Sequence, residues 1–109
     1  FSEAEANAIE FELAMALLQS GSADVLSHAG GMSLRTFGGF PASCFDELIA
    51  EAAKTDIAFE INSSYHTAVL DDLLALLQKY DPLVSLGSDV HKLCSLGDCR
   101  DKVRSALGL

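Results

Sequence analysis

The sequence predicts an α/β fold in which parallel strands alternate with helices, as a partial (β/α) barrel of three βα units. Three short runs, at 24–27, 57–62 and 83–86, have the length and the flanking turn residues of buried strands. Helical patterns precede the first run and follow each of the three. Such alternation is typical of parallel strands joined by right-handed crossovers. Because three strands cannot close a barrel, we expect residues 1–109 to form a single segment of one.

The first helix is predicted to begin after Ser2, because Ser2 and Glu5 have the spacing of a capping box. Gly21 is expected to end it. The predicted buried face comprises Ile9, Leu13, Ala16 and Leu17, widened by Phe11, Met15 and Leu18. The glutamates are assigned to the solvated face without a further role: Glu3, Glu5, Glu10 and Glu12.

A glycine-rich loop is expected at 29–40, and Pro41 suits the first turn of the helix that follows it. Residues 63–66 are expected to form the exit loop of the second strand, before a helix over 67–79 that Asp81-Pro82 ends. The core faces of these helices are predicted from helical spacing: Phe45, Leu48, Ile49, Ala52 and Ala53 on one, and Val69, Leu70, Leu73, Leu74 and Leu77 on the other. A last short helix is expected from about Asp98, burying Val103, Ala106 and Leu107.

Composition restricts the classes of function. Half of the 109 residues are hydrophobic, so the chain has enough apolar surface for a sizeable core, and no apolar run approaches the length of a membrane span. The net charge of −9 argues against nucleic acid as a partner, since gripping a phosphate backbone needs clustered Lys and Arg. A small phosphorylated substrate stays open, because bound metal ions supply positive charge locally. Three cysteines without disulfide spacing, and no visible signal peptide, favour a cytoplasmic location.

Polar residues gather at or just past the ends of the three predicted strands. His28 follows the first strand, Glu60 and Asn62 close the second, and Asp89 and His91 come shortly after the third. The carboxyl ends of parallel strands meet at one edge of a sheet, which is where sites are built in α/β folds. Carboxylate and imidazole are ligands for zinc, manganese or iron. The sequence therefore predicts a metal site at this edge.

Three stretches in this order resemble the PHP (polymerase and histidinol phosphatase) family of metal-dependent phosphoesterases. They are Asp24-Val25-Leu26-Ser27-His28-Ala29-Gly30, Phe59-Glu60-Ile61-Asn62-Ser63-Ser64, and Leu86-Gly87-Ser88-Asp89-Val90-His91 with Leu96-Gly97 downstream. The resemblance covers nearly the whole chain from Asp24 onward. It implies the C-terminal part of a distorted (β/α)7 barrel with up to three metal ions at its mouth.

The resemblance also implies roles for single residues. His28, Asp89 and His91 would be metal ligands, and Glu60 and Asn62 would support the ligands or contact substrate. The family's remaining ligands, which include an early His-x-His pair and a bridging glutamate, have no counterpart in this chain. Ala29 stands where the family usually has a proline. The implied reaction is hydrolysis of a phosphate monoester or phosphodiester by a metal-activated water.

Arg35 and His66 each have two possible interpretations. Arg35 is the most attractive phosphate contact, since guanidinium binds phosphate bidentately, but it is equally typical of a surface loop. His66 is expected either to contact substrate or simply to precede a helix. Cys44 lies in a predicted helix and is not assigned as a nucleophile. His91, Cys94 and Cys99 do not have the spacing of a zinc site, which needs four ligands.

The sequence leaves two alternatives to a phosphoesterase. The chain could be an incomplete, inactive piece that acts as a structural or binding unit, or it could be a metal hydrolase of the amidohydrolase type. In either case a parallel sheet with an open edge is prone to pair with another chain. The expected partner is therefore the missing N-terminal barrel half or a separate chain that supplies it, and the isolated segment is expected to associate.

Overall fold

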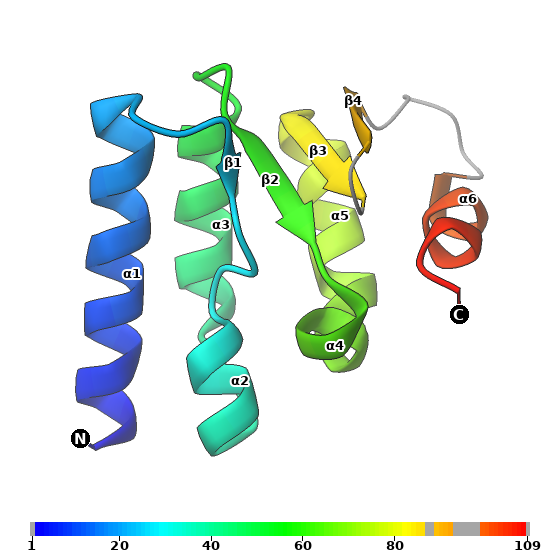
Figure 1. The fold of residues 1–109 in the computed structure, drawn as a ribbon. Helices are drawn as coiled ribbons and strands as arrows, with labels where there is room; N and C mark the ends of the chain where they lie inside the picture. Colours follow the sequence, from blue (N-terminus) through cyan, green and yellow to red (C-terminus); the bar gives the residue numbers. More distant parts are fainter. Residues whose placement is uncertain (1, 87–88, 93–98, 109) are drawn as a thin grey trace.

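The computed structural model describes residues 2–86, 89–92 and 99–108, with the backbone alone at 89–92 and 99–100 (Figure 1). Its elements alternate as the sequence predicts, with additional short helices after the first two strands. In chain order they are α1 Glu3–Ser20, β1 Val25–Leu26, α2 Gly31–Phe37, α3 Ala42–Ala52, β2 Ala58–Ile61, α4 Ser63–His66, the 3₁₀ helix η1 Thr67–Val69, α5 Leu70–Tyr80, β3 Leu83–Leu86, β4 Asp89–Lys92 and α6 Cys99–Ala106.

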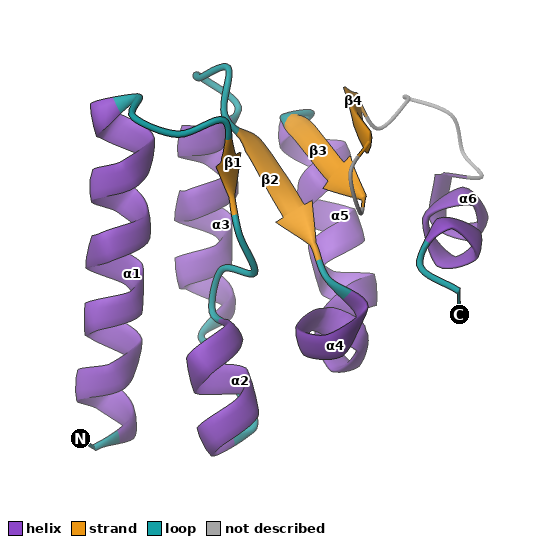
Figure 2. Cartoon of the chain, viewed as in Figure 1, coloured by secondary structure: helices purple, strands orange, loops and turns teal. Residues whose placement is uncertain are grey.

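The sheet has the strand order β1-β2-β3-β4 (Figure 2). The first three strands are parallel, as expected, with Leu26 opposite Phe59 and Phe59 opposite Val84. β4 was not expected: it runs antiparallel to β3, with Asp89 opposite Leu86. Residues 89–92, which were expected to lie just past the third strand, thus run back alongside it. An α/β sheet is confirmed, while the described residues form an open sheet and no closed barrel.

Helices α1, α3 and α5 stand side by side along the sheet (Figure 1). Phe59, Ile61 and Val84 of the sheet are buried in one core with the apolar faces of α3 and α5. The core positions predicted for those two helices are confirmed at Phe45, Leu48, Ile49, Ala52, Leu70, Leu73, Leu74 and Leu77, all buried. Of the positions predicted for the last helix, Val103 is buried and Leu107 partly buried, whereas Ala106 is exposed.

Helix α1 has the predicted ends but only part of the predicted buried face. The Ser2–Glu5 capping box forms, and Gly21 ends the helix in the left-handed conformation. Ala14 and Leu18 are buried, with Phe11 and Met15 packed beside them, whereas Leu13 is 67% exposed. The prediction was wrong at Ile9, Leu13 and Ala16, which are exposed, because α1 carries two apolar stripes and helical spacing cannot tell which stripe meets the core.

The predicted loop at 29–40 contains a helix, α2. Its N-terminus is held by Glu10 of α1, whose two carboxylate oxygens accept the N–H groups of Met32 at 3.3 Å and Ser33 at 2.6 Å. Glu10 was wrongly assigned to the solvated face, since a cap supplied from a distant helix leaves no local signal. Gly30, at φ 75°, has Phe40 so close that an added Cβ would lie 2.8 Å from its ring.

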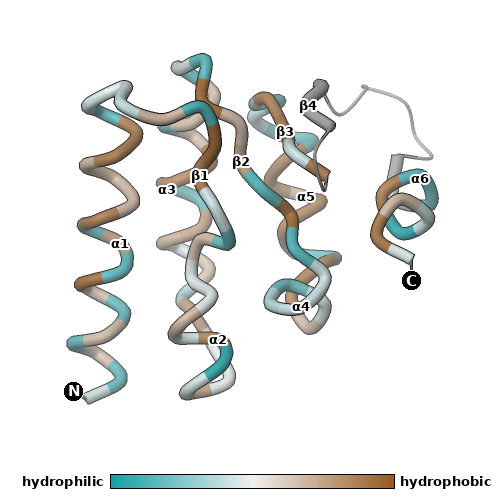
Figure 3. The backbone as a smooth tube through the Cα atoms, in the orientation of Figure 1, coloured by the Kyte–Doolittle hydropathy of each residue, from teal (hydrophilic) through white to brown (hydrophobic). Residues whose placement is uncertain are grey.

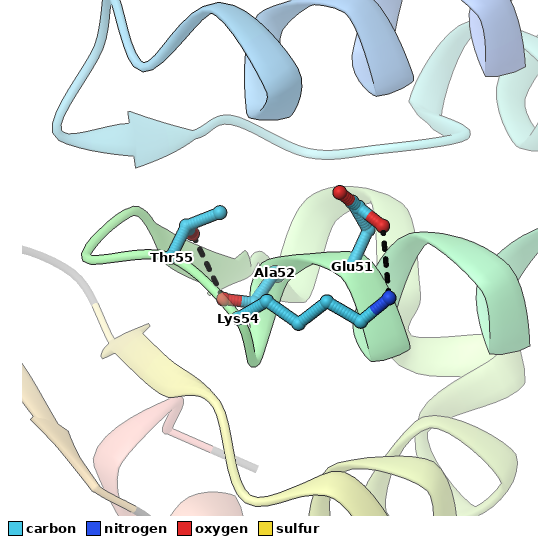
Figure 4. A network of polar contacts seen from close by, with 4 residues as sticks. All are labelled: Glu51, Ala52, Lys54 and Thr55. Carbon is cyan, nitrogen blue, oxygen red and sulfur yellow. Dashed lines mark hydrogen bonds and ion pairs between the residues drawn. The ribbon is translucent and has the colours of Figure 1, made fainter.

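The exit of β2 is also helical rather than a loop. Asn62 is the N-cap of α4, where its Oδ1 accepts the N–H of Ser64 at 2.9 Å. The entry to β2 is a tight turn, shown in Figure 4: the Thr55 hydroxyl donates to the carbonyl of Ala52 at 2.8 Å, and Lys54 pairs with Glu51. Asp81 ends α5 in the left-handed conformation, as the Asp81-Pro82 pair predicts.

In the part of the chain that the structure describes, every helix is too short or too polar to span a bilayer.

Candidate functional site

His28 occupies the C-terminal end of β1, as predicted, and its side chain is exposed. Its backbone has a φ of 31°, in the left-handed region that residues other than glycine seldom adopt. Such a conformation persists only where surrounding contacts hold it. The contacts around His28 therefore show how the fold presents this imidazole.

Glu60 of β2 supplies the main contact. Its Oε1 accepts the backbone N–H of His28 at 2.8 Å. The bond joins the ends of two neighbouring parallel strands, and it satisfies a carboxylate that would be costly to bury alone. Glu60 therefore contacts the backbone of His28, and the support that the sequence predicts it gives to the imidazole as a ligand stays a prediction.

Tyr65 and Arg35 extend this cluster. The rings of His28 and Tyr65 meet edge-on, 4.6 Å between centroids, and the Arg35 guanidinium lies 4.2 Å from the Tyr65 ring centroid. Gly31 makes room for the tyrosine, since a Cβ there would lie 2.7 Å from its ring. Arg35 is thus oriented by a cation–π contact from α2 while its side chain stays exposed. Tyr65 carried no signal in the sequence.

His66 belongs to the interior of the fold. It is fully buried; its Nδ1 accepts the N–H of Asn62 at 3.0 Å, and its Nε2 lies 2.9 Å from the carbonyl of Ala29. Because a carbonyl only accepts, Nε2 must carry the proton, so the ring is the neutral Nε2–H tautomer. Burial lowers the pKa of His66, the largest cause, against a smaller opposing effect of the Ala29 bond. His66 therefore links the segment that follows β1 to the segment that follows β2 through two hydrogen bonds to their backbones.

The backbone of Asp89 and His91 is placed by the register of β4. Asp89 lies opposite Leu86 at the end of β3, and Leu86 lies opposite Ile61 of β2. Continuing the register of β1 and β2 by two residues places His28 opposite Ile61, so Asp89 and His28 lie at the same level of the sheet, three strands apart. His91 lies opposite Val84, one two-residue step from that edge, rather than past the strand end as expected. Cys94 lies outside the described residues, so the trio with His91 and Cys99 has no structural counterpart here.

Two hollows flank this edge. The larger, about 380 Å³, lies between α1 and β1 and is lined mainly by apolar side chains together with His28 and Tyr65. The smaller, about 270 Å³, is lined by Glu60, Asn62 and residues at the end of α6. Glu60 lines the smaller hollow and bonds to the backbone of His28, which lines the larger.

The described side chains do not by themselves form a metal centre. Among them, no group of three or more His, Cys, Asp or Glu residues gathers at a distance that would hold an ion. His28 and Glu60 are the two adjacent donors at the edge, and Oε1 of Glu60 is already engaged. The donor types suit zinc, manganese or iron, but a complete site needs ligands beyond these two.

Comparisons with models of protein families, with curated proteins and with solved structures find no match.

Proposed function

We propose that the chain is the C-terminal part of a metal-dependent phosphoesterase whose site lies at the C-terminal edge of the sheet. The observation that carries the proposal is the presentation of His28. Its imidazole is exposed at the end of β1, on a backbone held in the left-handed region by Glu60 of the next strand. In open parallel sheets, ligands bind outside the carboxyl ends of the strands. A held, exposed histidine at that place suits a metal ligand.

In this proposal His28, Asp89 and His91 hold divalent cations. With strands about 4.8 Å apart, the backbones of β1 and β4 are about 14 Å apart across the sheet. Because metal–ligand bonds are about 2 Å long, His28 on one side and Asp89 and His91 on the other would bind separate ions rather than share one. Three ligands are too few for a multinuclear cluster, so another segment or chain would supply the others.

The bound cations would lower the pKa of a water molecule and neutralise charge on a phosphate ester. Arg35 would donate two hydrogen bonds to phosphate oxygens, with its guanidinium plane set by Tyr65. Glu60 would act as a positioning residue through the backbone of His28. Asn62 would act through the turn that it caps. Cys44 is a poor nucleophile here, since burial raises the pKa of its thiol and keeps it protonated.

An inactive unit that needs a partner is the second candidate, and the open edge of β1 favours it. Among the described strands, β1 pairs with β2 alone. This second candidate is compatible with the first, because a chain that is inactive by itself would still contribute its metal ligands to a site that another segment completes.

Metal content of the purified chain tests the proposal. Mass spectrometry should find zinc, manganese or iron near one equivalent or more, with clear loss in His28→Asn and His91→Ala. Asp56→Asn is the matched control, because Asp56 is an exposed residue just before β2, at the opposite edge of the sheet. Equal loss in the control, or no uptake by the unaltered chain when zinc, manganese or iron is added in excess, would contradict the proposal. Hydrolysis of a phosphate ester but not of an amide would then separate it from the amidohydrolase alternative.

A further inference from the structure

The crossover pattern of the fold is regular except at β1. Helix α3 lies on the path from β1 to β2, and α5 on the path from β2 to β3. Helix α1 stands beside α3 in the same layer and leads into β1 through residues 21–24 (Figure 1). Right-handed crossovers place each helix over the two strands that it joins. The described structure provides only one strand for α1, and the position of the other is the open side of β1.

The backbone of β1 is oriented to receive a strand there. The carbonyl of Asp24 accepts from Ala58, and the N–H of His28 donates to Glu60, so residues 24, 26 and 28 direct their polar groups toward β2. Because these directions alternate along a strand, Val25 and Ser27 direct their N–H and C=O groups to the open side. The edge therefore offers a parallel hydrogen-bonding ladder beside α1.

The space beside that edge is an apolar groove, here called the α1–β1 groove. It has a volume of about 380 Å³ and is lined from α1 by Leu13, Ala14 and Leu17 and from β1 by Val25 and Leu26. Leu13 is 67% exposed, and Met32, in the first turn of α2, also lines the groove and is 65% exposed. Figure 3 shows hydrophobic residues along both α1 and β1. One side of the groove is apolar and the other is strand backbone, which together match one face and one edge of a β-strand.

Charge selects among possible occupants. The first 34 residues contain no Lys or Arg, and their acidic residues are Glu3, Glu5, Glu10, Glu12 and Asp24. A second copy would bring the same acidic segment against itself, from a chain of net charge −9. Opposite charge across an interface speeds association and like charge opposes it. The surroundings of the groove thus suit a segment with basic flanks.

We propose that the α1–β1 groove receives one β-strand from a partner segment, added parallel to β1, apolar toward α1 and flanked by Lys or Arg. The C-terminal end of that strand would lie beside His28. If the proposed function holds, it would then bring further ligands to the metal site. The docking itself requires neither metal nor activity, so it can be tested separately.

A synthetic peptide, Lys-Val-Thr-Val-Leu-Val-Thr-Lys amide, probes the groove of the full 109-residue chain. Nuclear magnetic resonance should show shifts and slowed hydrogen exchange at the amides of Val25 and Ser27. A peptide with proline at its centre should bind at least tenfold more weakly, because proline cannot donate to the ladder. Replacing the terminal lysines by glutamates should also weaken binding, by about threefold or more.

Leu13→Asp should lower the affinity about tenfold or more, whereas Phe37→Asp, an exposed apolar position outside the groove, should change it less than about twofold. Circular dichroism checks that both variants fold. If Leu13→Asp does not fold, Ser27→Pro, which removes one donor of the open edge, should show the same loss. Undisturbed Val25 and Ser27 amides, or equal binding of the proline peptide, would overturn the proposal. So would a dimer of the chain alone that protects those amides, because the occupant would then be a second copy.

Discussion

The surroundings of His66 and of His28 differ although both histidines lie where β1 and β2 end. His66 is fully buried between Phe45 and Phe59, and both of its ring nitrogens are bonded to backbone. His28 is exposed; its backbone is held by Glu60 and its ring contacts Tyr65. Both ring nitrogens of His66 are engaged, whereas the ring of His28 is exposed at the edge of the sheet. The difference teaches that partners and burial, rather than residue type, separate a structural histidine from a candidate ligand.

The largest expected effect is the loss of the His66 ring. His66→Ala should lower the free energy of unfolding by about 3 kcal/mol, because it leaves a cavity and two backbone groups without partners. Urea denaturation measures the change. A loss below about 1 kcal/mol would mean that water replaces both bonds easily, and the contrast between the two histidines would be weaker than the geometry indicates.

Lowering the pH should remove part of the stability that the His66 ring contributes. The pKa of His66 is lowered in the folded chain, so the unfolded chain binds the extra proton first as the pH falls below the ordinary value of 6.5. The stability that His66 contributes is therefore present above that pH and is lost below it. The stability difference between the unaltered chain and His66→Ala should narrow from about pH 8 to about pH 5.5. A constant difference would show that the ring titrates normally.

Breaking the bond between the two strand ends should have an intermediate effect. Glu60→Ala should cost about 1.5–2 kcal/mol, the lower part of the range usual for a hydrogen bond to a charged group, because Glu60 is only partly buried. Glu60→Gln should cost less, because an amide oxygen still accepts. Glu47→Ala, an exposed position on α3, is the control. If Glu60→Ala left both stability and the His28 resonances unchanged, the carboxylate would not be what holds that backbone.

The cap that α1 gives to α2 should be weaker still. Glu10→Ala should cost about 1 kcal/mol, because two N–H groups at the start of α2 lose their acceptor. Glu12→Ala, exposed on the same helix, should be close to neutral. Thermal unfolding of the pair measures the difference. Equal effects would mean that water caps α2 as well as Glu10 does.

The smallest effect on stability is expected at His28. His28→Asn should change the free energy of unfolding by less than about 0.5 kcal/mol, since the side chain is exposed and asparagine tolerates a positive φ. Denaturation beside His66→Ala gives the comparison directly. A loss of more than about 1.5 kcal/mol would show that His28 is a structural residue in spite of its exposure.

The sequence predicted the parts of the fold that depend on local pattern. Periodicity and caps are patterns among residues close together in the sequence. They predicted the strand positions, the ends of α1 and the core faces of α3 and α5. What it did not predict depends on distant partners. Helix α2 is capped by Glu10 from α1, β4 depends on pairing with β3, and the exposed stripe of α1 depends on which neighbours are present.

The site shows the same division. The end of β1 identified His28 as a candidate, and the end of β2 identified Glu60. The contact of Tyr65 with both His28 and Arg35 had no sequence signal, since it arises from the packing of α2 against α4. Asn62 could have been assigned as a helix cap, because asparagine before Ser63-Ser64 is typical of an N-terminus.

A zinc titration followed by nuclear magnetic resonance of the imidazoles tests the central claim most directly, because the chain contains three histidines and His66 serves as an internal reference. We predict that the His28 resonances shift and saturate as zinc is added, while those of His66 stay in place, and that His28→Asn weakens zinc binding. Unchanged His28 resonances at excess zinc, or equal shifts at His66, would contradict a metal site at this edge of the sheet.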